Sequence, residues 1–189
     1  MADHAVETHG SLDIWVNNAG IGYLMKPLFD VTPQDWAAVI DVNLTGAFFG
    51  VQAAADRMIK GGRGGRIINI ASQAAKSGVP FAQAYTASKH GLVGLARSAA
   101  IELGEHGITV NNVCPNHVTT GLGAWQNEYY AGRLGKTLEQ YMADMKAKIP
   151  MGRNGLPEDT AHAVAFLCHP NSSYITAESM NVSGGEDPH

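Results

Sequence analysis

The sequence predicts an α/β fold in which a parallel sheet of about four strands lies between two layers of helices. Short runs of β-branched residues alternate with longer segments of helical periodicity, which is the pattern of repeated strand–helix–strand units. Crossovers between such strands are right-handed, so the carboxyl ends of the strands should all meet at one edge of the sheet. Ligands of parallel sheets bind outside that edge, and the chemistry is expected there.

The predicted elements begin and end at local signals. The predicted strands are the runs 12–16, 66–71, 108–113 and 179–183. The predicted helices are 2–9, 32–60, 82–105 and 156–169. In the second helix Thr32 is the N-cap, Pro33 follows it in the first turn, and a break is expected near Asn43. Gly10 and Gly107 end two of the helices, as glycine commonly does at a helix C-terminus.

The composition excludes several classes of protein. The 189 residues are 45% hydrophobic and 16% charged, so we expect residues 1–189 to form a single domain with a buried core. The net charge of −4 offers no basic surface for nucleic acid or for an anionic membrane. The two cysteines, Cys114 and Cys168, cannot build a disulfide framework and fit a reducing compartment. Because no apolar run approaches a membrane span and no signal sequence is present, a cytoplasmic protein without nucleic-acid or membrane partners is expected.

A tyrosine, a lysine and a serine stand where a parallel sheet places its chemistry. Tyr85 and Lys89 lie four residues apart near the start of the third predicted helix, so their side chains share one face. A phenol has a pKa near 10, and a neighbouring ammonium lowers that pKa, which makes Tyr85 a usable proton acceptor. Ser72 ends the preceding strand, where its hydroxyl could orient a substrate oxygen. A Tyr-x-x-x-Lys pattern alone is more often a surface pair, and its place after a strand ending in serine favours catalysis.

Five segments carry a family resemblance. They are Asn17-Asn18-Ala19-Gly20, the run 41–46 around Asn43, the set of Ser72, Tyr85 and Lys89, the run 111–120, and Pro157-Glu158-Asp159 with Tyr174-Ile175-Thr176. In this order and spacing they resemble the short-chain dehydrogenase/reductase family over nearly the whole chain, from residue 12 to residue 185. The resemblance implies a Rossmann-like, three-layer fold. It also implies hydride transfer between an alcohol or carbonyl substrate and NAD or NADP.

The resemblance further implies roles for single residues. Ser72, Tyr85 and Lys89 would form a catalytic tetrad with Asn43, which would hold a water behind Lys89. The implied cofactor-binding residues are Asn18, Ala19, Gly20, Tyr85, Lys89, Pro115, Val118 and Thr120. Among these, Val118 through its backbone and Thr120 through its hydroxyl would meet the nicotinamide carboxamide. Asn43 could also be only a helix kink, and Asn17 could serve only to tie neighbouring strands together.

The chain departs from the family pattern at two places. The family begins with a strand and a glycine-rich turn that holds the cofactor pyrophosphate. This sequence is expected to be an N-terminally truncated form without that turn and the first three strands. Gly20-Ile21-Gly22 cannot replace the turn, because a dinucleotide fingerprint needs glycine where Met25 stands. Asn116 stands where the family has glycine. We expect it to tolerate a positive φ and to project toward the nicotinamide.

Residues 119–149 are polar and aromatic with helical pieces, and they resemble the substrate lid of the family. Trp125 and Tyr129 could stack on a substrate, with Asn116 also near it, while Asn127 and Glu128 could hydrogen-bond its hydroxyls. The aromatic rings could equally serve only to pack the lid. Such a lid favours a polyol or a sugar as substrate. The eight histidines show no metal-ligand spacing, so no metal is expected.

The leading interpretation is an NAD- or NADP-dependent enzyme that interconverts a secondary alcohol and a carbonyl. The alternative is a non-catalytic fragment that self-associates without binding a dinucleotide, because the sequence lacks the phosphate-binding turn. A related isomerase or lyase with the same Tyr–Lys pair is a third interpretation, which the position of Ser72 disfavours.

Association between copies is expected for two reasons. The strand at 12–16 would have an unpaired apolar edge and would lack a helix layer on one face. The helices at 43–60 and 82–105 resemble those of the family's dimer interface, so a homodimer or homotetramer is expected.

Overall fold

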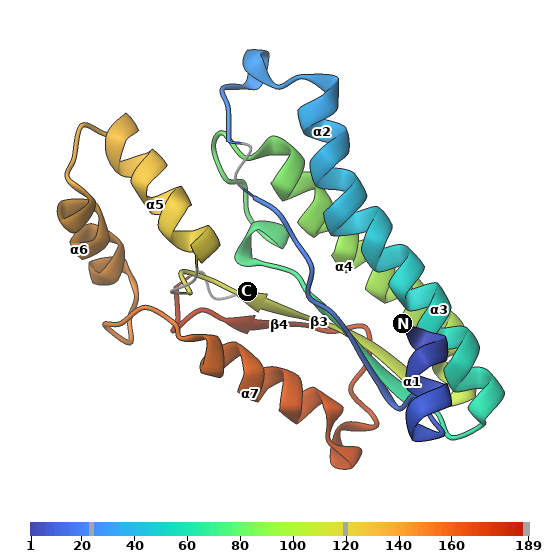
Figure 1. Ribbon diagram of the computed structural model, residues 1–189. Helices are drawn as coiled ribbons and strands as arrows, with labels where there is room; N and C mark the ends of the chain where they lie inside the picture. The colour runs from blue at the N-terminus through green and yellow to red at the C-terminus, as the bar shows by residue number, and fades with distance from the viewer. Residues whose placement is uncertain (23–24, 119–120, 187–189) are drawn as a thin grey trace.

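The computed structural model, which describes residues 1–22, 25–118 and 121–186, contains a parallel sheet with helices on both faces (Figure 1). Its strands are β1 (Ile14–Asn17), β2 (Gly65–Ile70), β3 (Ile108–Pro115) and β4 (Ser179–Val182). Its α-helices are α1 (Ala2–His9), α2 (Pro33–Ile40), α3 (Gly46–Gly61), α4 (Gln83–Leu103), α5 (Gly121–Arg133), α6 (Leu138–Lys148) and α7 (Pro157–Cys168). The strand order is β1-β2-β3-β4, and each neighbouring pair is parallel. The predicted fold class and the four-stranded parallel sheet are therefore confirmed.

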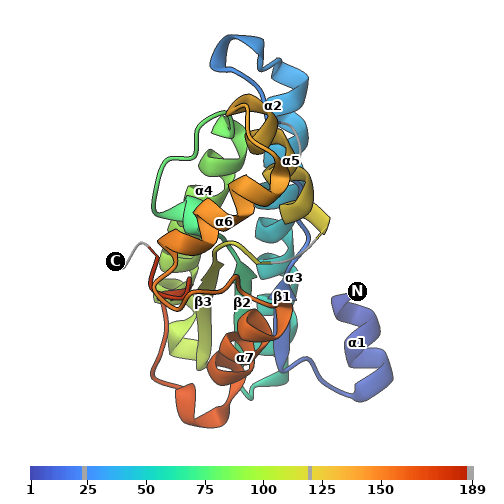
Figure 2. The same cartoon turned by 90° about the vertical axis from the view of Figure 1, so that its left-hand side faces the viewer.

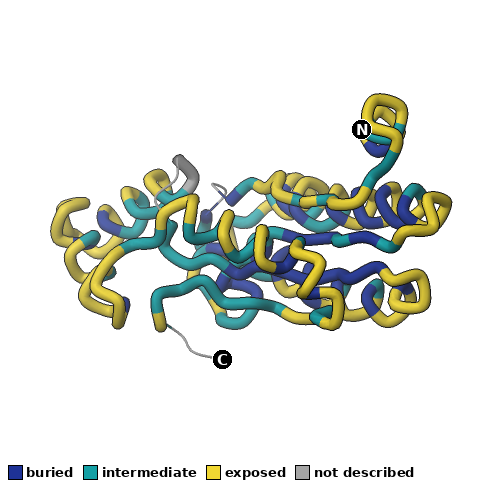
Figure 3. The backbone as a smooth tube through the Cα atoms, turned by 90° about the horizontal axis from the view of Figure 1, so that it is seen from below, coloured by how far each residue is buried: buried dark blue, intermediate teal, exposed yellow. Residues whose placement is uncertain are grey.

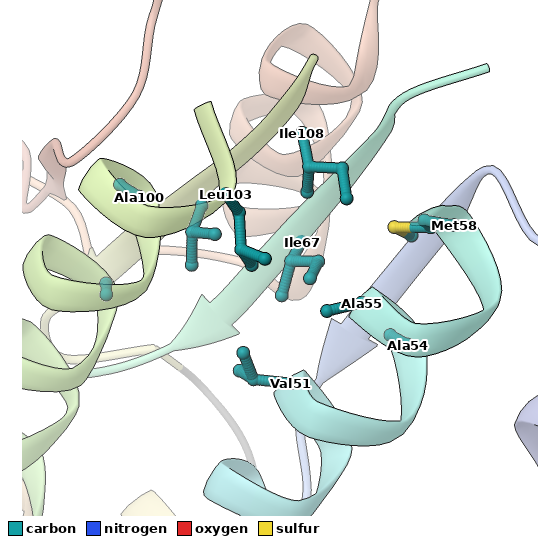
Figure 4. Close-up of a cluster of buried hydrophobic side chains, with 10 residues drawn as sticks. Val51, Ala54, Ala55, Met58, Ile67, Ala100, Leu103 and Ile108 are labelled. Carbon is teal, nitrogen blue, oxygen red and sulfur yellow. The ribbon is translucent and has the colours of Figure 1, made fainter. Parts of the chain in front are cut away.

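The sheet separates two helical layers because successive residues of a strand point to opposite faces. Ile67 of β2 packs against Val51 of α3 and Leu103 of α4, in the cluster drawn in Figure 4. Its neighbour Ile68 lies on the other face, in a cluster with Leu167 of α7. A strand buried on both faces needs apolar residues at successive positions, which is why β2 shows no polar alternation in its middle. The helices α5 and α6 stand at the carboxyl ends of the strands, nearest the viewer in Figure 2.

A row of polar side chains crosses the sheet inside its core. Asn17, Asn69 and Asn112 are register partners on β1, β2 and β3, and Ser179 is the partner on β4. Asn17 Nδ2 donates to Asn69 Oδ1 at 2.8 Å, and Asn69 Nδ2 donates to Asn112 Oδ1 at 3.1 Å. Asn112 Nδ2 completes the row by donating to Ser179 Oγ at 3.0 Å. Shifting one strand by a residue would leave buried amides unpaired, so the row fixes the register, and Asn17 does tie neighbouring strands.

The helical run from Pro33 to Gly61 contains one irregular turn. Thr32 caps its start, since its hydroxyl accepts from the Asp35 N–H at 3.1 Å and its own N–H donates to the Asp35 carboxylate at 3.0 Å. At η2 (Asp41–Thr45) the run widens into a π-turn between α2 and α3, which confirms the expected break.

By length and composition, this run from Pro33 to Gly61 is the one helix of the described residues that could cross a membrane. The expectation that no apolar run approaches a membrane span is therefore wrong for this segment. In the structure the run contacts β1, β2 and α4, which is the position of a core helix.

The strand β1 forms an incompletely covered edge of the sheet. Within the described residues it pairs with β2 alone, and α7 packs on β2, β3 and β4. Ile14 and Val16 point to the uncovered face and are 48% and 39% exposed. Figure 3 shows α1 projecting from the body of the chain. An ion pair between Asp3 and Arg57 joins it to α3. The expected apolar edge without a helix layer on one face is thus confirmed.

Candidate active site

Ser72, Tyr85 and Lys89 meet at the carboxyl edge of the sheet. Ser72 follows β2 and caps a short 3-10 turn, where its Oγ accepts from the Ala74 N–H at 3.1 Å. The phenol of Tyr85, in the first turn of α4, is hydrogen-bonded to the Ser72 side chain. One turn further along α4, Lys89 Nζ lies 5.5 Å from the centre of the Tyr85 ring. The structure therefore brings together the three side chains that the sequence singled out.

Burial dominates the electrostatics of this group. Burial raises the pKa of the Tyr85 phenol, and the hydrogen bond to Ser72 offsets only part of that effect. The expected lowering of the Tyr85 pKa by Lys89 is not found, because the net shift is upward and Lys89 is not among its causes. Burial also lowers the pKa of Lys89 to about 8. Its ammonium donates to the Ile70 carbonyl at 2.7 Å, and at neutral pH it is charged yet releases its proton more easily than a surface lysine.

Asn43 joins the loop after β1 to the start of α4. Its side chain is fully buried in η2, where Oδ1 accepts from the Ile21 N–H at 2.8 Å and Nδ2 donates to the Ile21 carbonyl at 2.9 Å. Nδ2 also donates to Ser88 Oγ at 3.1 Å, and Ser88 donates to the Tyr85 carbonyl at 2.7 Å. Asn43 therefore does more than kink a helix, because it connects the π-turn with the helix that bears Tyr85. The water relay from Asn43 to Lys89 stays a prediction.

Gly20 lies beside Asn43 and Lys89, with room for a methyl group. It ends the exposed run Asn18-Ala19-Gly20, which follows β1 at the carboxyl edge. A methyl group added at Gly20 would lie 3.4 Å from Asn43 Oδ1 and 3.6 Å from Lys89 Nζ. A bound molecule can therefore approach the backbone here and reach the Lys89 ammonium.

These residues fit one half of a nicotinamide dinucleotide. The buried Lys89 ammonium has N–H groups beyond the one given to Ile70, and with Tyr85 and the open backbone at Gly20 it suits a ribose and the nicotinamide beside it. Among the described residues, the segment after β1 offers the pyrophosphate half no comparable partner. In the described residues the segment after β1 leads to the short 3-10 turn η1 (Leu28–Asp30), so no glycine-rich turn there opens an α-helix.

The turn after β3 differs from the expectation. The positive φ, 43°, is at His117 and not at Asn116. Asn116 Nδ2 donates to Glu186 Oε2 at 2.9 Å, and Asn116 Oδ1 accepts from the His117 N–H at 3.1 Å. His117 Nε2 lies 3.3 Å from Glu186 Oε2. The expected positive φ at Asn116 is therefore wrong, and its side chain is held by the C-terminal segment.

The run 111–120, predicted to contact the nicotinamide, lies only partly within the described residues. Pro115 ends β3, and Val118 forms a β-bridge with Gly155. Thr120 lies outside the described residues. No group of three His, Cys, Asp or Glu side chains within residues 1–22, 25–118 and 121–186 could hold a metal ion.

The aromatic residues of the lid contact one another. The Trp125 and Tyr129 rings stack at 5.7 Å with an angle of 16° between their planes. Tyr129 also meets the Phe81 ring edge-on at 6.2 Å, and the Tyr130 hydroxyl donates to the Pro80 carbonyl at 2.7 Å. These contacts tie α5 to the loop that precedes Tyr85. Stacking of Trp125 or Tyr129 on a substrate stays a prediction.

Two glutamines that the sequence analysis did not single out lie close to the catalytic group. Gln126 Nε2 donates to the Gly22 carbonyl at 3.4 Å, beside the Tyr85 ring. Gln73 directly follows Ser72 and is only 4% exposed, and neither side-chain atom of its amide has a hydrogen-bond partner among the described residues. The position next to Ser72 could have signalled Gln73. Gln126 carries no such signal, because only the orientation of α5 brings it to the site.

Comparison with known proteins agrees with this geometry. The family model described as enoyl-(acyl carrier protein) reductase matches residues 1–186. The L-2,3-butanediol dehydrogenase of Corynebacterium glutamicum is 40% identical over 183 residues, which cover 97% of this chain and 70% of that protein. The chain belongs to the short-chain dehydrogenase/reductase family. It is accordingly an oxidoreductase of the class that acts on CH–OH groups.

Solved structures of the short-chain dehydrogenase/reductase family share the fold. Sorbitol-6-phosphate 2-dehydrogenase SrlD from Erwinia amylovora superimposes with a TM-score of 0.95 at 32% identity, covering 100% of this chain and 73% of its own. An actinorhodin polyketide ketoreductase variant, solved with NADPH, gives a TM-score of 0.93 at 37% identity over 100% of this chain and 72% of its own. The chain thus spans about 70% of the length of these relatives.

Proposed function

We propose that this chain interconverts a secondary alcohol of a polyol and the corresponding carbonyl, with a nicotinamide dinucleotide as hydride carrier. The observation that carries the proposal is the contact of Tyr85 with Ser72, one helical turn from the buried ammonium of Lys89. A phenol hydrogen-bonded to a second hydroxyl offers one group that exchanges a proton and another that orients the oxygen.

Each residue then has a defined task. When bound, the nicotinamide dinucleotide accepts the hydride from the alcohol carbon or returns it to the carbonyl carbon. The Tyr85 oxygen takes the proton of the substrate hydroxyl in oxidation and gives it back in reduction. Ser72 Oγ hydrogen-bonds the same substrate oxygen and aims it at Tyr85. The Lys89 ammonium stabilises the phenolate while it exists, which matters because burial otherwise opposes that charge.

Two observations support a polyol substrate. The proteins similar to this chain include enzymes named for 2,3-butanediol and for sorbitol 6-phosphate, and both compounds carry hydroxyls on neighbouring carbons. The site also offers amides that can bind such hydroxyls, Gln126 beside Tyr85 and Gln73 beside Ser72. The similarity to named dehydrogenases does not support the alternative of a non-catalytic fragment. The choice between NAD and NADP is left open by this proposal.

Titration with the reduced nucleotide tests this proposal. We expect saturable binding of NADH or of NADPH. It is measured as energy transfer from the tryptophans to the reduced nicotinamide; Trp15 lies in β1 and Trp125 in the lid. The Lys89→Met variant should bind more weakly, because Lys89 would contact the ribose. Absence of binding for both nucleotides at millimolar concentration, with the chain shown to be folded, would contradict the proposal and favour the non-catalytic fragment.

A further inference from the structure

One polar side chain of the lid lies against the same glycine as Tyr85. Gln126, on α5, donates from Nε2 to the carbonyl of Gly22, a residue of the loop after β1. A methyl group placed on Gly22 would lie 3.1 Å from Gln126 Nε2 and 3.2 Å from the Cδ2 and Cε2 atoms of Tyr85. The amide of Gln126 and one edge of the Tyr85 ring therefore both lie against the backbone of Gly22, an approach that a side chain at residue 22 would obstruct.

The hydrogen bond that Gln126 makes is easily exchanged. Its length is 3.4 Å, beyond the 2.7–3.2 Å range usual for N–H···O bonds, so it is weak. A primary amide has two N–H groups and a carbonyl oxygen, and this bond uses one N–H. Gln126 can therefore bind a hydroxyl or a carbonyl oxygen of another molecule at little cost.

The neighbours of Gln126 on α5 are engaged elsewhere. Asn127 lines a cavity of about 150 Å³, formed with His117, Val118 and Met142 among others. Trp125 stacks on Tyr129. Successive residues of a helix point about 100° apart, so one residue of this run faces Tyr85 while the next faces α6. The hydrogen bond to Gly22 and the nearness to Tyr85 point to Gln126, whereas the sequence predicts contacts with hydroxyls for Asn127 and Glu128.

We propose that Gln126 is a specificity residue that binds the oxygen on the carbon next to the reacting carbon, and so selects vicinal diols and α-hydroxy ketones over simple secondary alcohols. This inference rests on the proposed function. Tyr85 and Ser72 hold the oxygen that reacts, and the lid amide beside Tyr85 is in reach of the oxygen one carbon away. The lid then contacts the substrate directly, and a substrate without the second oxygen leaves the amide with its weak bond to Gly22.

A matched pair of substrates tests the assignment. The wild-type chain should oxidise 2,3-butanediol with a higher kcat/KM than 2-butanol, which lacks the second hydroxyl. Gln126→Leu should lower kcat/KM for the diol about tenfold, the usual effect of one lost hydrogen bond, mostly through KM. It should change kcat/KM for 2-butanol by less than a factor of about three, because Tyr85 and Ser72 are intact. Gln126→Glu retains an acceptor and should restore part of the preference for the diol.

Asn127, the next residue of α5, provides the control. Asn127→Leu makes the same polar-to-apolar change one position along α5, and it should leave the ratio of the two kcat/KM values as in the wild type. The assignment is overturned if Gln126→Leu keeps the wild-type ratio, or if Asn127→Leu is the variant that lowers it. If the wild-type chain oxidises neither alcohol with NAD or NADP, the proposed function fails and the inference fails with it. If the wild-type chain is active but Gln126→Leu does not change the ratio of kcat/KM for 2,3-butanediol to kcat/KM for 2-butanol, the proposed function stands and the inference alone fails.

Discussion

Lys89 carries a charge where the protein offers little solvation. It is 4% exposed, and burial lowers its pKa to about 8 from an ordinary value of 10.5. The unfolded chain therefore holds the proton between pH 8 and 10.5 while the folded chain does not. Under that condition the free energy of unfolding rises with pH. The proposed reaction near neutral pH uses the charged lysine, which is the form that burial disfavours.

The variant Lys89→Met isolates this effect. The difference in the free energy of unfolding, wild type minus variant, should increase by up to about 3 kcal/mol between pH 8 and 10.5, because only the wild type is relieved of a buried charge. Urea denaturation of both proteins at pH 7, 8, 9 and 10 measures the difference. A difference that stays flat over this range would mean that Lys89 is solvated in the folded chain.

The positions of side chains that depend on helical spacing could be predicted from the sequence. The positions that depend on how distant segments pack together could not. Tyr85 and Lys89 share a face because they are four residues apart on one helix, and Ser72 follows a recognisable strand. Gln126 depends on how α5 rotates and docks over Gly22, which no local pattern encodes. The positive φ at His117 likewise occurs in a turn that contacts Glu186, a residue 69 positions away in the sequence, which accepts a hydrogen bond from Asn116.

At the scale of elements, α3 lies unusually close to β1. A methyl group at Gly50 of α3 would be 2.1 Å from Asn17 Oδ1 and 2.9 Å from Trp15 Nε1. Trp15 Nε1 donates to Asn17 Oδ1 at 2.7 Å, so both atoms belong to the polar row that begins in β1. The close approach needs a residue without a side chain.

A pair of glycine substitutions tests this contact. Gly50→Ala should destabilise the fold by about 1–3 kcal/mol, because the methyl group forces the Asn17 side chain to move. Gly94→Ala is the matched control in a helix, since nothing lies within 4 Å of the added methyl group and alanine favours the helix by about 0.5–1 kcal/mol. Thermal or urea unfolding should therefore shift in opposite directions for the two variants. A stabilising Gly50→Ala would show that α3 does not approach β1 as described.

The elements themselves were largely predictable, because capping and periodicity are local. The predicted boundaries lie within a few residues of the observed ones, as for the strand at 66–71, observed as Gly65–Ile70. The break near Asn43 was also predicted, but its form as a π-turn was not. That form follows from contacts of Asn43 with Ile21 and Ser88, which belong to other parts of the chain.

At the scale of the whole molecule, two of the exposed apolar surfaces among the described residues bear on association. On β1, Ile14 and Val16 lie on a face that α7 does not cover, next to the unpaired edge of the strand. On α3, Phe48 and Phe49 are 45% and 57% exposed. Exposed apolar groups of this kind favour association, so we expect the chain to form a homodimer or homotetramer.

Light scattering on size-separated protein tests the expected association and distinguishes the surfaces. The wild-type chain should elute as an oligomer. A lysine that is buried without a partner opposes contact between copies. Phe49→Lys should therefore weaken the oligomer if copies meet through α3. Val16→Lys should weaken it if they meet through β1. A wild-type chain that stays monomeric at tens of micromolar would contradict the expectation for both surfaces.

The central claim is that Tyr85 exchanges the substrate proton in an oxidoreductase reaction, and one measurement tests it most directly. The wild-type chain and Tyr85→Phe are each mixed with 2,3-butanediol and with NAD or NADP, and nicotinamide reduction is followed by its absorbance. The wild type should turn over with one of the nucleotides. The rate should be at least about a hundredfold lower for Tyr85→Phe, since the variant retains the ring and loses the group that takes the proton. This is the result expected if Tyr85 exchanges the substrate proton. Equal rates for the two proteins, or no turnover by a folded wild-type chain with either nucleotide and a range of polyols, would contradict it.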